Sequence, residues 1–322
     1  MQAYPLLLSP ACKDYLWGGN RLRLLYGKQS DADRIAETWE LSCHPDGESR
    51  VTNGVLAGCT LSEALERLGR RALGERAARL SYFPLLIKLI DAKQDLSIQV
   101  HPDDAYAAVH ENGSLGKTEM WYVVDAQPDS ALICGFSRDV SREEVRRRIG
   151  ERTLTDVLQR VPVRAGDVLF IEAGTIHAIC GGVLIAEIQQ NSNTTYRVYD
   201  YGRLDKDGRP RPLHVEKALD VLRFGPAAPP RHPETEPDGA GNGVAVLASC
   251  PLFRVERWEL AGEKRLVEPD SFVSLLLLSG RAELTWADGT AVCPPGQSIF
   301  VPAGLRCALR GECELLATVV GG

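Results

Sequence analysis

Most of the chain alternates apolar and polar residues, or runs apolar, over short stretches that end at Gly, Pro, Asn or Asp. Short stretches of this kind are typical of β-sandwiches and β-barrels. Residues 1–8 read better as a first strand than as a signal peptide, because they are too few and lack the basic residues of a signal peptide. We therefore expect a mainly β protein.

Helical periodicity is confined to four stretches. Thr60-Leu61-Ser62-Glu63 has the pattern of a capping box, which opens an amphipathic helix. The first stretch runs from Thr60 through Ala72, the second follows Ser141-Arg142-Glu143-Glu144, the third covers Leu154 to Val161, and the fourth runs from near His214 to around Phe224. These few helices are expected to pack on the β structure.

Residues 225–243 read GPAAPPRHPETEPDGAGNG, with five prolines, four glycines and almost no apolar side chains. Such a composition favours a linker or a long exposed loop. We therefore expect a first domain over residues 1–224, a linker over 225–243 and a second domain over 244–322.

A 17-residue segment recurs in the two expected domains. Residues 163–179 and 293–309 align without gaps and share five identities, at Gly166, Phe170, Ala173, Gly174 and Ala178 of the first copy. The pattern resembles the second motif of jelly-roll cupins, in which the last variable position is a metal ligand. That position holds His177 in the first copy and Cys307 in the second. We expect two jelly-roll barrels, of which the second is degenerate and lacks metal ligands.

Composition narrows the possible partners. Apolar residues make up 44% and charged residues 25%, as in a soluble globular protein, and no apolar run reaches the roughly 18 residues of a membrane span. The net charge of −6 argues against a nucleic-acid or anionic-membrane surface. Nine cysteines at irregular spacing, without a Cys-x-x-Cys pair, indicate reduced thiols and a cytoplasmic protein.

Two strands carry candidate metal ligands. In residues 96–101 the two-residue period places Ser97, Gln99 and His101 on one face. Buried polar groups need partners, and a metal would supply one; a strand with a solvated polar face is the alternative. In residues 116–124 the same alternation aligns Lys117 and Glu119, for which an exposed ion pair is the alternative.

His177 completes a candidate donor set. A lone His in an apolar strand is usually a core residue, but its spacing from Gly166 matches the cupin motif. Nitrogen and oxygen donors from His101, Glu119 and His177 suit Zn²⁺ or a similar first-row ion in a catalytic site. Gln99 can add a fourth, weaker oxygen ligand.

The segment from Glu187 to Arg203 combines amides, hydroxyls, aromatics and charges over two expected strands. Arg197 lies among Thr195, Tyr199 and Tyr201 on one strand face. An arginine flanked by aromatic residues suits an anionic, polyhydroxylated ligand, because its planar fork binds phosphate through two hydrogen bonds. An exposed polar hairpin is the alternative interpretation.

Together these residues resemble the type I mannose-6-phosphate isomerases, in their short bacterial form. The matching segments span residues 1 to about 223. They are Trp17-Gly18-Gly19, Glu37-Thr38-Trp39-Glu40-Leu41-Ser42, residues 95–103 around Gln-Val-His-Pro, Gly116-Lys117-Thr118-Glu119-Met120-Trp121, Gly174-Thr175-Ile176-His177 and residues 187–203. The part after residue 243 matches only as a degraded β-barrel.

The resemblance implies a role for each matching residue. It places one Zn²⁺ per chain, or another divalent first-row metal, on His101, Glu119 and His177 with Gln99 as a further ligand. It also implies that Arg197 is the active-site arginine. Lys117, Ser97 and Glu187 match residues that line the sugar-phosphate pocket, and Arg203 matches a cation that binds the phosphate. The partner it implies is a small sugar phosphate, with neither nucleic acid nor membrane, and we expect a monomer or weak homodimer.

The implied reaction interconverts mannose 6-phosphate and fructose 6-phosphate through a metal-stabilised enediol. Glu187 and Lys117 are both candidates for the base that takes the C2 proton, and the sequence does not choose between them. Arg197 is expected to stabilise the enediolate or to hold the phosphate. Two other classes stay open on the same scaffold: a cupin oxygenase, and a non-catalytic metal-containing sugar-binding cupin.

Overall fold

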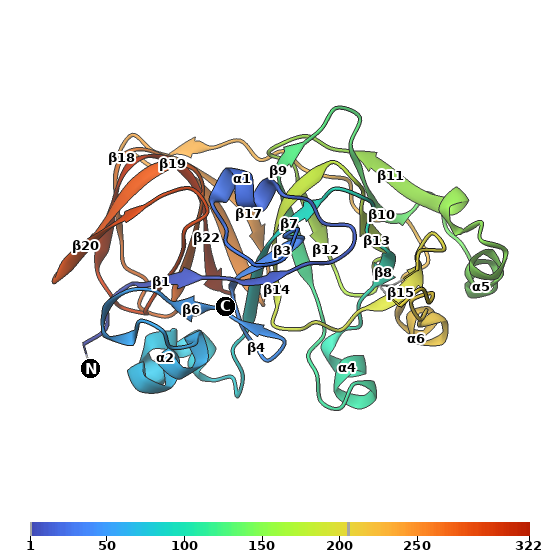
Figure 1. Ribbon diagram of the computed structural model, residues 1–322, viewed down its shortest axis with the longest axis horizontal. Helices are drawn as coiled ribbons and strands as arrows, with labels where there is room; N and C mark the ends of the chain where they lie inside the picture. The colour runs from blue at the N-terminus through green and yellow to red at the C-terminus, as the bar shows by residue number, and fades with distance from the viewer. Residues whose placement is uncertain (1, 205–206) are drawn as a thin grey trace. The chain divides into compact units, whose positions relative to one another are not determined.

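A computed structural model describes residues 2–204 and 207–322, and the chain folds mainly into antiparallel β-strands (Figure 1). It divides into two compact units. Unit 1 contains the residues up to Lys13, Asn20–Leu89 and Pro233–Gly322, and unit 2 contains Asp14–Gly19 and Ile90–His232. Among the described residues, no helix is both long enough and apolar enough to cross a membrane.

Unit 1 is built on one large antiparallel sheet, in the order β16-β17-β18-β22-β19-β21-β1-β6, with β20 paired to β19. Its core is formed by apolar side chains such as Leu275, Leu309 and Leu315. The strands of this sheet are β1 (Leu6–Ser9), β6 (Arg50–Val51), β16 (Glu236–Pro237), β17 (Gly243–Ser249), β18 (Phe253–Leu266), β19 (Val273–Trp286), β20 (Gly289–Cys293), β21 (Ser298–Val301) and β22 (Cys307–Val320).

The remaining elements of unit 1 are short. Two further antiparallel pairs join β2 (Ala11–Lys13) to β3 (Glu37–Leu41) and β4 (Cys43–His44) to β5 (Gly47–Glu48). The helices are α1 (Arg21–Tyr26), η1 (Gly54–Leu56), α2 (Leu61–Leu68), η2 (Arg70–Leu73) and α3 (Gly74–Ala78). Strand β7 (Leu85–Ala92) carries the chain from unit 1 into unit 2.

Unit 2 contains two antiparallel sets of strands. The five-stranded set has the order β11-β10-β13-β8-β15, and the second set has the order β12-β9-β14. The strands are β8 (Ile98–Val100), β9 (Glu119–Ala126), β10 (Ala131–Phe136), β11 (Leu158–Pro162), β12 (Val168–Ile171), β13 (His177–Ile179), β14 (Val183–Gln190) and β15 (Tyr196–Tyr199).

Among its described residues, unit 2 also contains three helices and one 3-10 turn. They are α4 (Asp104–His110), α5 (Arg142–Glu151), η3 (Leu154–Val157) and α6 (Val215–Val221). Residues of α5, η3 and α6 share one hydrophobic core with Ile98 and Val100 of β8, and Figure 1 shows α5 and α6 beside the strands of the five-stranded set. Since strand side chains alternate, Gln99 points to the opposite face of that set. That face carries the polar residues of the site.

The expected helices form with one exception. Thr60 and Glu63 make the capping box, and Ser141 accepts a hydrogen bond from the backbone of Glu144. The helix expected from Leu154 to Val161 is wrong, because a 3-10 turn ends at Val157 and β11 follows. Pairing of β11 with β10 and burial of its apolar side chains outweigh the local helical spacing.

The recurring segment has the same local structure in both copies. Gly166 and Gly174 have φ of +90° and +87°, and the corresponding Gly296 and Gly304 have +80° and +72°. Only glycine adopts this region readily, so each pair brackets one strand and sets the turn after it. His177 then begins β13, and Cys307 begins β22.

Residues 225–243 are more ordered than the expected linker. Gly135 forms an isolated β-bridge with Pro226, and Val168 forms another with Arg231, both within unit 2. Further along, β16 pairs with β17 within unit 1. The grouping of the chain also differs from the expected boundaries, because most of residues 1–89 belong to the same unit as residues 233–322.

Candidate metal centre

Three buried donors from different strands meet in unit 2. His101 directly follows β8, Glu119 begins β9 and His177 begins β13. One ligand atom from each lies within 4.8 Å of the other two, and the three residues are at most 1% exposed. The Nε2 atoms of the histidines are 3.1 Å apart. The structure thus brings together the three residues predicted as ligands.

Backbone carbonyls orient both imidazole rings. The Nδ1 atoms of His101 and His177 lie 2.9 Å from the carbonyl oxygens of Thr194 and Thr175. A carbonyl only accepts, so each Nδ1 carries the proton and each Nε2 presents a lone pair. Burial, and then the charge of Lys117, lower the pKa of His177 to about 3, which keeps that ring neutral. Metal-binding histidines are oriented in this way.

The donor set already accepts a positive charge. The Lys117 ammonium donates to His101 Nε2 at 3.0 Å and to the Glu119 carboxylate. The Glu119 carboxylate lies 3.7 Å from His101 Nε2 and 3.4 Å from His177 Nε2. The Lys117 ammonium thus occupies a place where two imidazole nitrogens with free lone pairs and one carboxylate converge. A first-row divalent ion prefers these donors, so the three residues fit a metal ion.

Gln99 and Ser97 lie beside this donor set. Gln99 is paired directly opposite His177 across β8 and β13, and its amide nitrogen lies 3.4 Å from His177 Nε2. Ser97 precedes β8 and is buried. The alternation predicted for residues 96–101 therefore points these polar residues inward, and the solvated-face alternative is wrong.

A second carboxylate faces Lys117. Glu187 of β14 is paired opposite Trp121 of β9, and its Oε2 accepts a 2.9 Å hydrogen bond from the Trp121 indole. Its Oε1 lies 3.8 Å from the Lys117 ammonium. The Trp121 ring also packs edge-on against His177, with 5.3 Å between ring centroids. Trp121 thus links the carboxylate to the donor set, and an exposed Lys117–Glu119 pair is excluded by their burial.

Arg197 extends the same row of side chains. It is paired opposite Gln99 across β15 and β8, as Gln99 is opposite His177. Directly opposed residues share a face, so Arg197, Gln99 and His177 form a row across three strands. Arg197 donates to the Pro212 carbonyl at 3.0 Å. Burial, and then the nearby Arg211 guanidinium, lower the pKa of Arg197.

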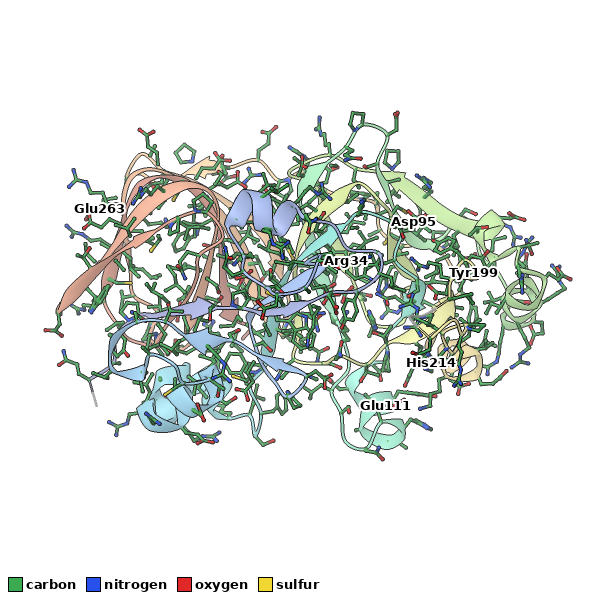
Figure 2. The ribbon with its side chains drawn as sticks, in the orientation of Figure 1. Arg34, Asp95, Glu111, Tyr199, His214 and Glu263 are labelled. Carbon is green, nitrogen blue, oxygen red and sulfur yellow. The ribbon has the colours of Figure 1, made fainter. Side chains whose placement is uncertain are left out.

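Asp200 gathers two further arginines. Arg211 donates from Nε at 2.7 Å and from Nη2 to the two oxygens of the Asp200 carboxylate. Arg203 donates to the same carboxylate and to the Asp95 carbonyl. Two guanidinium groups thus share one carboxylate, which leaves a surplus of positive charge near Arg197. Figure 2 labels Asp95, and also Tyr199 of β15 and His214, which precedes α6, on this unit.

Some residues of the site were not predicted. Arg211 and Asp200 come together with Arg197 only because residues 211–214 run along β15, where the His214 amide donates to the Arg197 carbonyl. No sequence pattern signals that contact. Trp121 could have been predicted from the sequence, because the two-residue period places it on the same face as Lys117 and Glu119.

A buried His–Glu–His set on antiparallel strands is the kind of site that metal-binding enzymes of the cupin type carry. Residues 6–139 match the family model of the phosphomannose isomerase type I catalytic domain, and residues 245–320 match that of the mannose-6-phosphate isomerase cupin domain. The chain belongs to the type I mannose-6-phosphate isomerase family.

Full-length relatives support this assignment. The chain is 39% identical to a mannose-6-phosphate isomerase of Streptococcus mutans, over 98% of both proteins, and 38% identical to one of Bacillus subtilis, over 99% of both. A crystal structure of the Bacillus subtilis mannose 6-phosphate isomerase has a TM-score of 0.90 at 35% identity, covering 98% of this chain and 99% of that one. A zinc-bound mannose 6-phosphate isomerase shares the fold, with a TM-score of 0.80 at 19% identity, covering 99% of this chain and 100% of that one. These matches favour the isomerase over the oxygenase and the non-catalytic module.

Proposed function

We propose that unit 2 interconverts mannose 6-phosphate and fructose 6-phosphate at one Zn²⁺ held by His101, Glu119 and His177, with Gln99 as a further ligand. The observation that carries the proposal is the buried pair of Nε2 lone pairs beside the Glu119 carboxylate. The zinc bound by a protein of the same fold supports the choice of metal, and Mn²⁺ or Co²⁺ suits the same donors. When bound, the ion supplies Lewis-acid polarisation of the substrate oxygens.

Glu187 is the proposed base. The reaction moves a proton between C2 and C1, which needs a group that accepts it and returns it. The Glu187 carboxylate is an acceptor, held by Trp121 through one oxygen. Lys117 contacts its neighbours as a donor, so its ammonium is suited to hold a substrate oxygen through the enediol stage. Glu187 thus accepts and returns the proton, and Lys117 donates a hydrogen bond to a substrate oxygen.

Arg197 is proposed to bind the phosphate. Two strand spacings separate it from His177, about 10 Å. A six-carbon sugar carries its phosphate at the end remote from C1 and C2, so one molecule can span this row. The surplus charge of Arg203 and Arg211 draws a phosphate dianion to the same end. Ser97, two residues before Gln99, is a candidate hydroxyl donor to the sugar.

A coupled assay of the wild-type chain on mannose 6-phosphate tests the function, with formation of fructose 6-phosphate as the expected result. No formation of fructose 6-phosphate by zinc-loaded protein would reject the proposed function.

Glu187→Gln tests whether Glu187 is the base. We expect kcat to fall by roughly 100-fold or more, as for removal of a general base. Retention of more than a tenth of the wild-type kcat would reassign the proton transfer. Zinc content should be unchanged, since Glu187 is not among the three donors.

We also propose a cytoplasmic protein that is a monomer or weak homodimer. The nine cysteines are all free thiols, which suits a reducing compartment. The size of the particle in solution, measured by light scattering, tests the second part. A stable tetramer would contradict it.

A further inference from the structure

Lys117 reaches the site from a segment without regular secondary structure. Residues 111–118 join the end of α4 to the start of β9, and residues 114–118 of this connection form neither helix nor strand. Holding such a segment in one conformation costs roughly 1–2 kcal/mol of backbone entropy per residue. Other parts of unit 2 must therefore fix it, because the Lys117 ammonium sits within hydrogen-bonding distance of His101 Nε2.

Two side chains tie the neighbours of Lys117 on either side. Asp104 Oδ1 accepts a 2.7 Å hydrogen bond from the Gly116 amide, and Gln190 Oε1 accepts a 2.9 Å hydrogen bond from the Thr118 amide. The two side chains are themselves joined, because Gln190 Nε2 donates to both oxygens of the Asp104 carboxylate at 2.9 and 3.2 Å. One continuous chain of hydrogen bonds thus encloses the backbone of Lys117.

Additional contacts restrict the conformation of residues 114–118 further. The Lys117 amide donates to the Pro102 carbonyl, and Ser192 Oγ donates to the Leu115 carbonyl. A Cβ at Gly116 would lie 2.5 Å from backbone atoms of Asp103 and Asp104, so the segment approaches α4 as closely as a glycine allows. Gln190 is only 4% exposed, which makes its hydrogen bonds costly to lose.

We infer that Asp104 and Gln190 are a positioning pair that sets where the Lys117 ammonium stands relative to the substrate. The inference rests on the proposed function for the role of Lys117 in catalysis. Neither residue is one of the three donors, and both accept hydrogen bonds from backbone amides next to Lys117, so the pair acts through the backbone. Its loss should lower kcat and leave zinc content unchanged.

Exchanging the amide and the carboxylate within the pair tests this role. Gln190→Glu places two carboxylates against each other, and Asp104→Asn places two amide groups there. In the double variant D104N/Q190E the new amide at position 104 donates to the new carboxylate at position 190. That carboxylate still accepts from Thr118, and the new amide oxygen accepts from Gly116. Gln190→Glu breaks the link between the two side chains, and the double change restores it. Asp104→Asn only weakens the link, because Oδ1 still accepts from the Gly116 amide and from Gln190 Nε2 while the 3.2 Å bond to the second oxygen is lost.

We expect kcat on mannose 6-phosphate to fall by roughly 100-fold in Q190E, because misplacing a catalytic group by about 1 Å can cost that much. KM should change far less, and the double variant should recover most of the kcat. Asp103→Asn is the matched control, because Asp103 caps α4 through the Tyr106 amide and asparagine caps equally well. Wild-type kcat in both single variants, or a double variant no better than the worse single one, would overturn the inference.

Hydrogen exchange separates this inference from the proposed function. In Q190E we expect faster exchange of the Gly116 and Thr118 amides, whatever the substrate of the protein. Unchanged exchange at both amides would overturn the positioning role. A wild-type chain without isomerase activity but with this faster exchange in Q190E would instead reject the proposed function alone.

Discussion

The Nε2 atoms of His101 and His177 face each other at 3.1 Å, and both rings carry their proton on Nδ1. Two lone pairs at this distance repel unless a positive charge lies beside them. Lys117 provides such a charge in this structure, and a divalent ion provides a stronger one. The close approach of these two nitrogens therefore predicts that the active protein holds a metal ion between them.

Chelation should abolish isomerase activity, and Zn²⁺, Mn²⁺ or Co²⁺ should restore it. A ligand that binds only the folded chain stabilises it by mass action, so removal of the metal should also lower the melting temperature by roughly 5–10 °C. Calorimetry and the coupled assay measure the two effects on the same sample. Full activity in metal-free protein would reject the metal role.

Single histidine variants locate the metal. His101→Ala and His177→Ala should each lose bound zinc, measured by elemental analysis, together with activity. His110→Ala is the control, because His110 is exposed at the end of α4 and stacks on Tyr106, away from the three donors. Equal zinc content in all three variants would place the ion elsewhere.

The sequence could predict the donor set because its members lie on strands with a regular two-residue period. The period places His101, directly after β8, on the face of Gln99, and Lys117, two residues before β9, on the face of Glu119. Paired glycines fix the turn before His177. Contacts made by irregular segments lie outside such a pattern. Arg211 meets Asp200 through packing of two irregular segments. Asp104 at the start of α4 meets Gln190 at the end of β14 through tertiary packing that neither element's own pattern signals. Residues 158–161 were misassigned for the same reason, since pairing with β10 overrides their helical spacing.

Arg197→Ala should keep the metal and lose turnover on mannose 6-phosphate. A hydrogen bond to a charged group contributes about 1.5–3 kcal/mol, so we expect kcat/KM to fall by roughly 10- to 150-fold. Arg164→Ala is the control, because its side chain is 76% exposed. Steady-state kinetics and zinc content measure both effects. Unchanged kinetics in the Arg197 variant would remove the proposed phosphate role.

Trp121→Phe should lower kcat without removing zinc. The ring stays against His177, but the indole N–H that holds Glu187 Oε2 is lost. Loss of a donor to a buried carboxylate costs about 1–3 kcal/mol, which corresponds to roughly 5- to 150-fold in kcat if Glu187 is the base. Trp258→Phe is a matched control, because Trp258 makes the same kind of hydrogen bond to Glu256 in unit 1. Equal kinetics in the two variants would contradict a role for Trp121 in placing the base.

Asp200→Asn should destabilise unit 2 in a pH-dependent way. Burial alone would raise the pKa of Asp200, but hydrogen bonds from Arg211 and Arg203 outweigh it, and the pKa is lowered. A carboxyl with a lowered pKa in the folded chain contributes stability above its unfolded pKa of about 3.9. That stability is lost as the pH falls through the folded pKa. We expect Asp200→Asn to cost about 1–3 kcal/mol at pH 7.

The difference in unfolding free energy between the wild type and Asp200→Asn should therefore be largest near neutral pH. It should shrink below about pH 4, as the wild-type carboxyl takes up its proton. Urea titrations at several pH values measure it. Asp129→Asn is the control, because Asp129 is exposed in a turn at φ +63°, a conformation that asparagine also adopts. A difference that stays constant down to pH 2 would mean that Asp200 stabilises unit 2 by its shape, and that the charge it shares with Arg203 and Arg211 contributes nothing.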